Sequence, residues 1–170
     1  MKKKLSILIF TDLDGTLLHR DTFTFDVIKN YIKDIISDRI YVIPNTSKTD
    51  KEILSFNQKL GEALPYITEN GSAIKGLNLI NKDLPKELIL SKEKEELINI
   101  FKNEVPEDLK IKCKWITKMN KENQLKILGL PEDQLTNSLD RKYTVPFIFD
   151  GNKNEKNELS KLLKFKSLTL

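Results

Sequence analysis

The chain has 170 residues, of which 39% are hydrophobic, enough for one ordinary domain or for a small domain with an insertion. Its 29 basic residues outnumber its 25 acidic residues for a net charge of +4, and the two signs are interleaved, so we expect a solvated surface and no nucleic-acid partner. With one cysteine, Cys113, and one histidine, His19, the sequence excludes an internal disulfide framework and a zinc site of cysteines and histidines. We expect Cys113 to fill apolar space and His19 to be a loop residue.

The start of the chain imitates a signal peptide, because three lysines precede an apolar run. That run stops at Asp12 and is shorter than the apolar segment that a signal peptide needs. No stretch of the sequence approaches the length of a membrane span. We therefore expect a soluble cytoplasmic protein with no membrane partner.

The most informative stretch is an apolar run over Leu5–Phe10 that ends in Asp12 and Asp14, followed by Gly15 and Thr16. Such a run predicts a strand of a parallel sheet that is buried on both faces. The acids then lie at its carboxyl end, where open α/β sheets bind ligands. Asp12 is suited to attack a phosphorus atom as a covalent nucleophile, and Asp14 to protonate the leaving oxygen and later deprotonate water.

The residues around these acids are the first candidates for binding phosphate. Gly15 permits a sharp turn that brings backbone N–H groups toward phosphate oxygens, and the Thr16 hydroxyl can brace the loop. We also expect Leu13, which lies between the two aspartates, to be a phosphate-binding residue. The alternative is an ordinary Asp-Gly turn that leads into a hairpin.

A strand and a helix then alternate along the chain. Apolar residues at helical spacing begin at Phe25 and continue through Ile28, Ile32, Ile35 and Ile36. A β-branched stretch at 40–43 predicts a second buried strand. Thr49 and Glu52 form a capping-box pattern, which predicts a helix from about residue 50 to residue 60. The repeated order of strand, turn and helix predicts a parallel sheet.

Polar turns follow the second and third expected strands. Thr46, Ser47 and Lys48 come at the carboxyl end of the second strand, beside Asp12 if the two strands are neighbours. Their hydroxyl and ammonium groups could hold phosphate oxygens, and a routine helix cap explains them equally well. A third strand is expected at 65–68, and residues 69–74 predict a tight turn with a return strand.

From about Asn81 the lysine and glutamate content rises, and the pattern becomes that of an α+β region. We expect strands at 88–90, 111–116, 145–149 and 166–170, and helices at 92–102, 121–128, 132–140 and 155–164. The strand at 111–116 alternates, so Ile111, Cys113 and Trp115 should face a core.

The Asp12–Thr16 segment, Asp-Leu-Asp-Gly-Thr, resembles motif I of the haloacid dehalogenase superfamily of phosphatases and phosphomutases. The resemblance implies an aspartyl-phosphate mechanism, Mg²⁺ as cofactor with Asp12 and Asp14 as metal ligands, and a phosphate clamp at Thr46 with Ser47 beside it and Lys48 adding charge. The Glu-Asn-Gly element at 69–71 is similar to that of members with a type IIB cap, in which residues equivalent to Asn70 and Gly71 line the substrate cleft. The implied fold is α/β, with a Rossmann-like parallel sheet in residues 1–80 and an inserted, incomplete α+β cap in residues 81–170.

Residues 121–147 look like the cap of mannosyl-3-phosphoglycerate phosphatases, through a Gly-Leu-Pro helix pair and an Arg-x-Tyr-Thr-x-Pro-Phe element at 141–147. Two glutamates of that element are replaced here by Lys142 and Val145. The implied reaction releases phosphate from mannosyl-3-phosphoglycerate, with Arg141 and Tyr143 as substrate-binding residues. An arginine can grip a carboxylate or phosphate through two hydrogen bonds, although a cation at a helix C-terminus also explains Arg141. A general sugar-phosphate substrate stays open.

In this superfamily two further elements follow the cap: a lysine that neutralises the nucleophile and the phosphate, and a Gly-Asp-x-x-x-Asp segment that completes the Mg²⁺ site. We find neither motif after Phe149. We therefore expect the chain to be the amino-terminal portion of such a phosphatase. The alternative is an inactive or split form that acts only by binding, or that needs a second polypeptide to supply the other half of the core. Without flanking strands the first strand would be an exposed edge.

Overall fold

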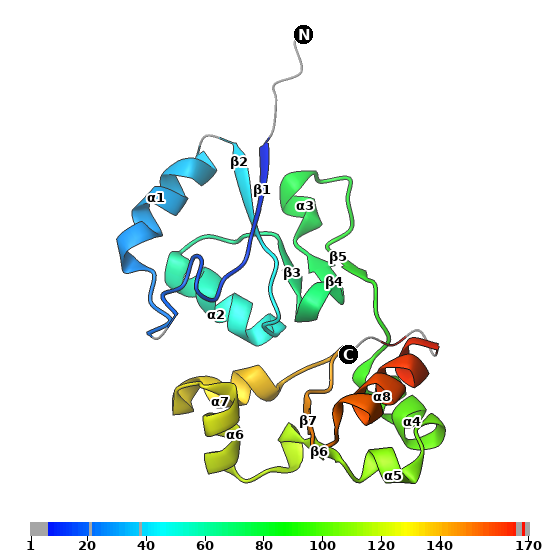
Figure 1. Cartoon of the computed structure of the whole chain (residues 1–170). Coiled ribbons are helices and arrows are strands. Elements are labelled where there is room, and N and C mark those ends of the chain that lie inside the picture. The colour runs from blue at the N-terminus through cyan, green and yellow to red at the C-terminus, as the bar shows by residue number, and fades with distance from the viewer. Residues whose placement is uncertain (1–6, 21, 38, 166–167, 169–170) are drawn as a thin grey trace. The chain divides into compact units, whose positions relative to one another are not determined.

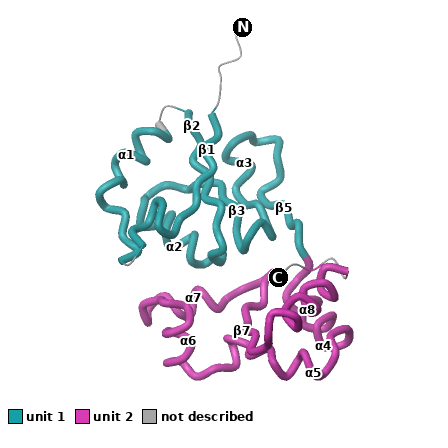
Figure 2. Tube along the Cα trace, viewed as in Figure 1, with its two compact units in different colours: residues 1–91 teal, residues 92–170 magenta. Residues whose placement is uncertain are grey.

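The computed structural model of the chain describes residues 7–20, 22–37, 39–165 and 168. The chain divides into two compact units, residues 1–91 and 92–170, which are coloured separately in Figure 2. The elements of the first unit are β1 (Ile7–Thr11), α1 (Asp26–Ser37), β2 (Ile40–Pro44), α2 (Asp50–Leu60), β3 (Tyr66–Thr68), η1 (Glu69–Gly71), β4 (Ala73–Lys75), α3 (Leu77–Ile80) and β5 (Glu87–Ile89). Those of the second unit are α4 (Lys94–Glu104), α5 (Glu107–Lys110), β6 (Cys113–Trp115), η2 (Ile116–Lys118), α6 (Lys121–Leu128), α7 (Glu132–Leu139), β7 (Phe147–Phe149) and α8 (Lys153–Phe165) (Figure 1).

The first unit is built on a parallel pair of strands, as the sequence predicts. β1 and β2 pair in register from Ile7 opposite Ile40 to Thr11 opposite Pro44. A single parallel bridge between Asn45 and Ile67 links the end of β2 to β3. β3, β4 and β5 form an antiparallel sheet of their own. Because parallel strands point the same way, the loops that follow β1 and β2 emerge at the same edge.

The core of the first unit lies under the helices α1 and α2. The α1 face predicted from the apolar spacing is the face that packs inward, with Ile32 buried and Ile28, Ile35 and Ile36 partly buried against the core. The rings of Phe25 and Phe56 contact each other at a centroid distance of 4.8 Å. The buried members of this core are Leu13, Leu18, Phe25, Ile32, Val42, Ile53, Phe56, Leu60, Leu64 and Tyr66.

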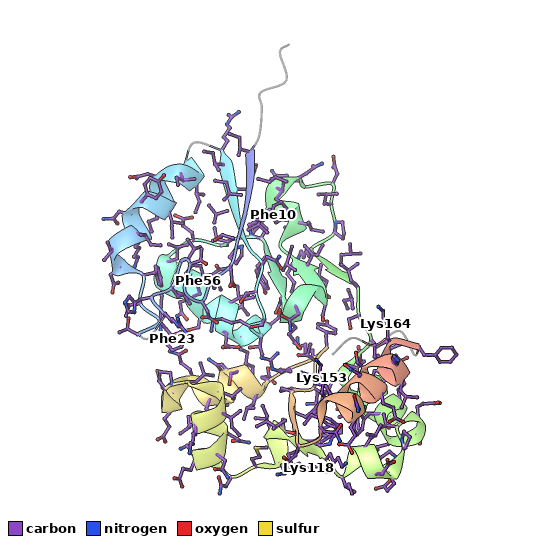
Figure 3. All side chains as sticks on the ribbon, viewed as in Figure 1. Phe10, Phe23, Phe56, Lys118, Lys153 and Lys164 are labelled. Carbon is purple, nitrogen blue, oxygen red and sulfur yellow. The ribbon has the colours of Figure 1, made fainter. Side chains whose placement is uncertain are left out.

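The expectation that β1 is buried on both faces is wrong. Its residues Ile7, Leu8, Ile9 and Phe10 are 38% to 59% exposed. β1 pairs only with β2, so its other edge is open within the described sheet. The apolar run predicted the strand correctly, but burial depends on neighbouring strands and helices, and among the described residues β1 has a strand on one side only. Phe10, labelled in Figure 3, projects from this strand.

Helix α2 forms over the predicted residues because of its caps. The Thr49 hydroxyl accepts the Glu52 N–H at 3.3 Å, and the Glu52 carboxylate accepts the Thr49 N–H at 2.9 Å, which completes the capping box. Gly61 ends the helix in the left-handed conformation, with φ of 83°, and its N–H bonds to the Asn57 carbonyl.

The second unit joins an antiparallel pair, β6 and β7, to helices α4, α5 and α8 around its own core. Cys113 is buried there, as expected, and its thiol donates to the Leu109 carbonyl at 3.5 Å. The expectation that Ile111 faces the core is wrong, because Ile111 caps helix α5 instead of entering the strand and is 70% exposed. The buried members of this core are Phe101, Val105, Leu109, Cys113, Leu159 and Leu163.

The border between the units differs from the composition change near Asn81. β5 pairs with β4, so residues 87–89 belong to the first unit, which extends to Ser91. The division into core and cap at residue 80 stays a prediction. The strand predicted at 166–170 falls, apart from Leu168, outside the described residues. In the part of the chain that the structure describes, no helix has the length and apolar character needed to cross a membrane.

Candidate active site at the ends of β1, β2 and β3

The loop after β1 is anchored by one apolar side chain and presents two carboxylates. Leu13 is fully buried in the core, whereas Asp12 and Asp14 on either side of it are exposed. The Leu13 N–H donates to the Asp12 carboxylate at 2.7 Å. Gly15 adopts φ of 72°, which a side chain would disfavour, and its N–H donates to the Leu18 carbonyl at 2.9 Å. The loop therefore holds both acids outward on a fixed turn, with Thr16 also exposed.

The loop after β2 lies directly beside this turn. The Asn45 N–H donates to the Thr11 carbonyl at 2.8 Å, which ties the end of β2 to the end of β1. Thr46 is buried, and its hydroxyl accepts the Lys48 N–H at 3.3 Å. Ser47 is exposed between them. β1 and β2 are thus neighbours, the condition under which residues 46–48 were expected beside Asp12.

The Glu69–Gly71 turn closes the same edge from the side of β3. Its N–H groups bond to the loop after β2, from Glu69 to the Lys48 carbonyl at 3.0 Å and from Asn70 to the Thr46 carbonyl at 3.1 Å. Glu69 and Asn70 adopt φ of 47° and 60°, and Gly71 follows at 90°. Positive φ in a buried glutamate is uncommon and costs free energy, so this turn is held by its surroundings.

Lys48 connects the loop after β2 to the carboxylates. Its ammonium lies 3.0 Å from the Asp14 carboxylate and 3.4 Å from the Glu52 carboxylate. The Lys48 and Glu52 side chains are each 8% exposed, and that of Asp14 is 41% exposed. The ring of Phe23, labelled in Figure 3, has its centroid 5.3 Å from the same ammonium. The site thus combines exposed carboxylates with a sheltered cation.

A second ionic cluster braces the strands behind the site. The Lys75 ammonium contacts the Asp50 carboxylate at 2.6 Å and the Glu87 carboxylate at 3.1 Å. The Tyr66 hydroxyl donates to Asp50 at 3.3 Å. Burial, reinforced by the negative charge of Asp50, raises the pKa of Tyr66 to about 12. Burial alone would lower the pKa of Lys75. The hydrogen bonds of its ammonium to Asp50 and Glu87 outweigh that effect, so the pKa is raised.

The donor atoms of the aspartate loop match Mg²⁺ in kind, because carboxylate and carbonyl oxygens are the hard ligands that this ion prefers. Asp12 and Asp14 are exposed and so are accessible to an ion. Within residues 7–20, 22–37, 39–165 and 168, the structure contains no group of three His, Cys, Asp or Glu side chains spaced to hold a metal. Water and substrate oxygens would have to complete an octahedral shell.

The remaining predicted residues lie elsewhere in the chain. Arg141 and Tyr143 belong to the second unit, where the Arg141 guanidinium donates to the Thr144 hydroxyl at 2.9 Å and Tyr143 is buried. His19 lies in a loop, as expected, and its imidazole accepts the Thr22 N–H at 3.4 Å.

Sequence reasoning missed two residues at the site, Phe23 and Glu52. Glu52 was predicted only as part of a capping box, and its contact with Lys48 was missed. Their spacing of four residues at the start of a helix is a signal that could have suggested this contact. Phe23 carried no signal, because its position depends on an irregular loop in which it adopts φ of 54°.

Solved structures share the fold of this chain. The chain resembles a haloacid dehalogenase-like hydrolase from B. subtilis, with a TM-score of 0.51 and 16% identity over 92% of this chain and 66% of that one. It also resembles one from Bacteroides thetaiotaomicron, with a TM-score of 0.59 and 12% identity over 96% and 65% of the two chains. At these identities the likeness concerns the fold.

Residues 9–168 match the haloacid dehalogenase-like hydrolase family, and the chain belongs to it. A glucosyl-3-phosphoglycerate/mannosyl-3-phosphoglycerate phosphatase of Persephonella marina is 31% identical over 159 residues, which are 89% of this chain and 58% of that protein. A protein of the same name from Methanococcoides burtonii is 40% identical over 67 residues, 39% of this chain and 25% of that one. The chain thus spans little more than half the length of the Persephonella relative.

Proposed function

We propose that this chain is the part of a phosphatase that carries the nucleophile, and that the phosphatase acts on a phosphorylated glycosyl ester such as mannosyl-3-phosphoglycerate. The observation that carries the proposal is the contact between Lys48 and Asp14, where a sheltered ammonium meets an exposed acidic loop at 3.0 Å. An anionic phosphate needs a cation near the attacking carboxylate, and Lys48 supplies one through its contact with Asp14, two residues along the same loop from Asp12. The names of the Persephonella and Methanococcoides relatives support the substrate class.

The proposed reaction has two displacements at phosphorus. In the first, an Asp12 oxygen bonds to phosphorus while the bond from phosphorus to the ester oxygen breaks, and Asp14 gives its proton to that leaving oxygen. In the second, Asp14 takes a proton from water, whose oxygen bonds to phosphorus as the bond to Asp12 breaks. The products are the glycosyl alcohol and inorganic phosphate, and both aspartates return to their starting states.

The residues around the aspartates would bind and orient the phosphate. We propose that the hydroxyls of Thr46 and Ser47 and the Lys48 ammonium contact its oxygens. Leu13, Gly15 and Thr16, whose N–H groups bond within the turn, would shape the floor of the phosphate site. Asn70 and Gly71 would line the substrate cleft, and Arg141 and Tyr143 of the second unit would recognise the rest of the substrate. Mg²⁺, when bound by the Asp12 carboxylate and the Asp14 carbonyl, would offset the charge of the phosphate.

Phosphate release measures this proposal directly. The chain is incubated with Mg²⁺ and each of mannosyl-3-phosphoglycerate, glucosyl-3-phosphoglycerate, 3-phosphoglycerate and a simple hexose phosphate. We expect release from the glycosyl esters, loss of release in Asp12→Asn, and loss on chelation of the metal. Equal rates for all four compounds would favour a general sugar-phosphate phosphatase, and unchanged release in Asp12→Asn would contradict the mechanism.

A second candidate follows from the open edge of β1. Because the apolar residues of β1 are exposed, we also propose a form that binds the phosphorylated sugar but needs a second polypeptide, paired with β1, for turnover. Calorimetric binding of mannosyl-3-phosphoglycerate without phosphate release by the chain alone would support this form. Turnover by the chain alone would exclude it.

A further inference from the structure

The Glu52 carboxylate makes two contacts with different consequences. One oxygen accepts the Thr49 N–H at 2.9 Å and thereby caps helix α2. The other oxygen lies 3.4 Å from the Lys48 ammonium. The first contact fixes the position of the carboxylate relative to the helix, because a capping box satisfies backbone donors in one geometry. Through the second contact, the fixed carboxylate holds the Lys48 ammonium in place.

The Lys48 ammonium needs such a partner because its side chain is only 8% exposed. A sheltered charge is costly unless other charges and hydrogen bonds compensate it. Asp14 lies closer, at 3.0 Å, but its side chain is 41% exposed and sits on a loop that must accommodate a ligand. Glu52 is as sheltered as Lys48 and belongs to a helix. It is therefore the fixed end of the Glu52, Lys48 and Asp14 chain of charges.

We propose that Glu52 is a positioning residue of the candidate site, acting through Lys48. By holding the ammonium against the start of helix α2, Glu52 keeps it at the place where it meets both Asp14 and a phosphate bound on the aspartate loop. This inference rests on the proposed function for its phosphate, and on the contacts of Glu52 with Thr49 and Lys48 for its geometry. Glu52 would then have two roles, capping the start of helix α2 and placing a phosphate-binding cation.

Replacing Glu52 by glutamine separates this role from two simpler ones. Glutamine also completes a capping box, so a residue needed only as a cap would tolerate Glu52→Gln. If Glu52 were only a nearby negative charge, its removal would make the site more positive and tighten the binding of an anion. The positioning role requires the opposite, since the ammonium would lose its fixed partner and bind phosphate less well.

The test uses the whole chain, orthophosphate as probe and calorimetry for the dissociation constant. We expect Glu52→Gln to weaken orthophosphate binding by about 10-fold, the effect of losing one charge-assisted hydrogen bond. The matched control is Glu62→Gln, which removes the same charge from an exposed position in the same unit and should leave binding unchanged. Urea unfolding of each variant checks that the fold is retained. Unchanged or tighter binding in Glu52→Gln would overturn the proposal.

A second measurement tests, without any phosphate, whether Glu52 holds the Lys48 ammonium in place. The ¹⁵N signal of the Lys48 ammonium, assigned with Lys48→Arg, should be protected from rapid proton exchange in the wild type and in Glu62→Gln and should broaden in Glu52→Gln. A wild-type chain that binds no orthophosphate would contradict the proposed function but not this inference. A Lys48 signal that Glu52→Gln leaves unaltered would then overturn the inference by itself.

Discussion

The buried hydroxyl of Tyr66 should make the first unit less stable as the pH rises above 10. The ring is buried in the core, and its hydroxyl donates to Asp50, which also contacts Lys75 at 2.6 Å. Burial and the charge of Asp50 raise the Tyr66 pKa from 10.0 to about 12. In the unfolded chain the hydroxyl loses its proton near pH 10, whereas in the folded chain it keeps the proton up to about pH 12.

The sign and the size of the effect follow from this difference. Below pH 10 both states hold the proton, and the contribution of the group to stability is fully present. As pH rises toward 12 the unfolded state alone loses its proton, so the free energy of unfolding falls. Each pKa unit corresponds to about 1.4 kcal/mol, so the full loss is about 3 kcal/mol. At pH 11, midway between the two pKa values, we expect a loss of about 1 to 1.5 kcal/mol.

Tyr66→Phe removes the ionisable group and keeps the ring. Urea unfolding followed by circular dichroism at pH 8 and pH 11 should show that the variant loses about 1 to 1.5 kcal/mol less than the wild type between these conditions. The raised pKa of Lys75 contributes to both chains and cancels in the comparison. Tyr31→Phe, at a tyrosine that is 67% exposed, is the control and should behave as the wild type. Equal losses in Tyr66→Phe and the wild type would refute the reasoning.

Three further substitutions test other parts of the structure. Thr49→Ala removes the hydroxyl that caps helix α2 and should lower the free energy of unfolding by about 1 kcal/mol in urea, while Thr49→Ser should lower it less. Leu159→Ala empties a fully buried position of α8 and should cost about 2 to 5 kcal/mol, measured as a lower midpoint of thermal unfolding. Phe10→Lys adds a charge to the exposed strand β1 and should reduce self-association in light scattering while changing stability by less than about 0.5 kcal/mol.

Each of these predictions has an outcome that contradicts it. An unfolding curve of Thr49→Ala that overlays the wild type would mean that the capping box does not form. A Leu159→Ala chain as stable as the wild type would mean that α8 does not pack on the core of the second unit. Self-association that persists unchanged in Phe10→Lys would mean that the edge of β1 is not the surface responsible.

The elements that the sequence predicts correctly are those set by local chemistry. Helix α2 begins after Thr49 and ends before Gly61 because its capping groups lie within a few residues of each end. The parallel pair β1 and β2 follows from the alternation of strand and helix, and it brings the turn at Thr46 beside the aspartate loop. The α/β class and the family are likewise confirmed.

The features that the sequence does not predict depend on contacts between distant residues. The exposure of β1 is decided by which strands lie beside it. The apolar run alone favoured burial, and only the absence of the later superfamily motifs pointed to an open edge. Ile111 leaves the expected strand because its N–H completes a bond to Glu107 at the end of α5. The cluster of Asp50, Tyr66 and Lys75 joins a helix to two strands, and no spacing rule connects them.

The roles of the candidate site residues remain predictions, and one measurement tests the most important of them. The chain is incubated with Mg²⁺ and mannosyl-3-phosphoglycerate, treated with borohydride, which reduces an aspartyl-phosphate to homoserine, and analysed by peptide mass spectrometry. We expect homoserine at Asp12 and intact aspartate at Asp14. Phosphate release with homoserine at Asp14, or with no modified residue at all, would contradict the claim that Asp12 is the nucleophile.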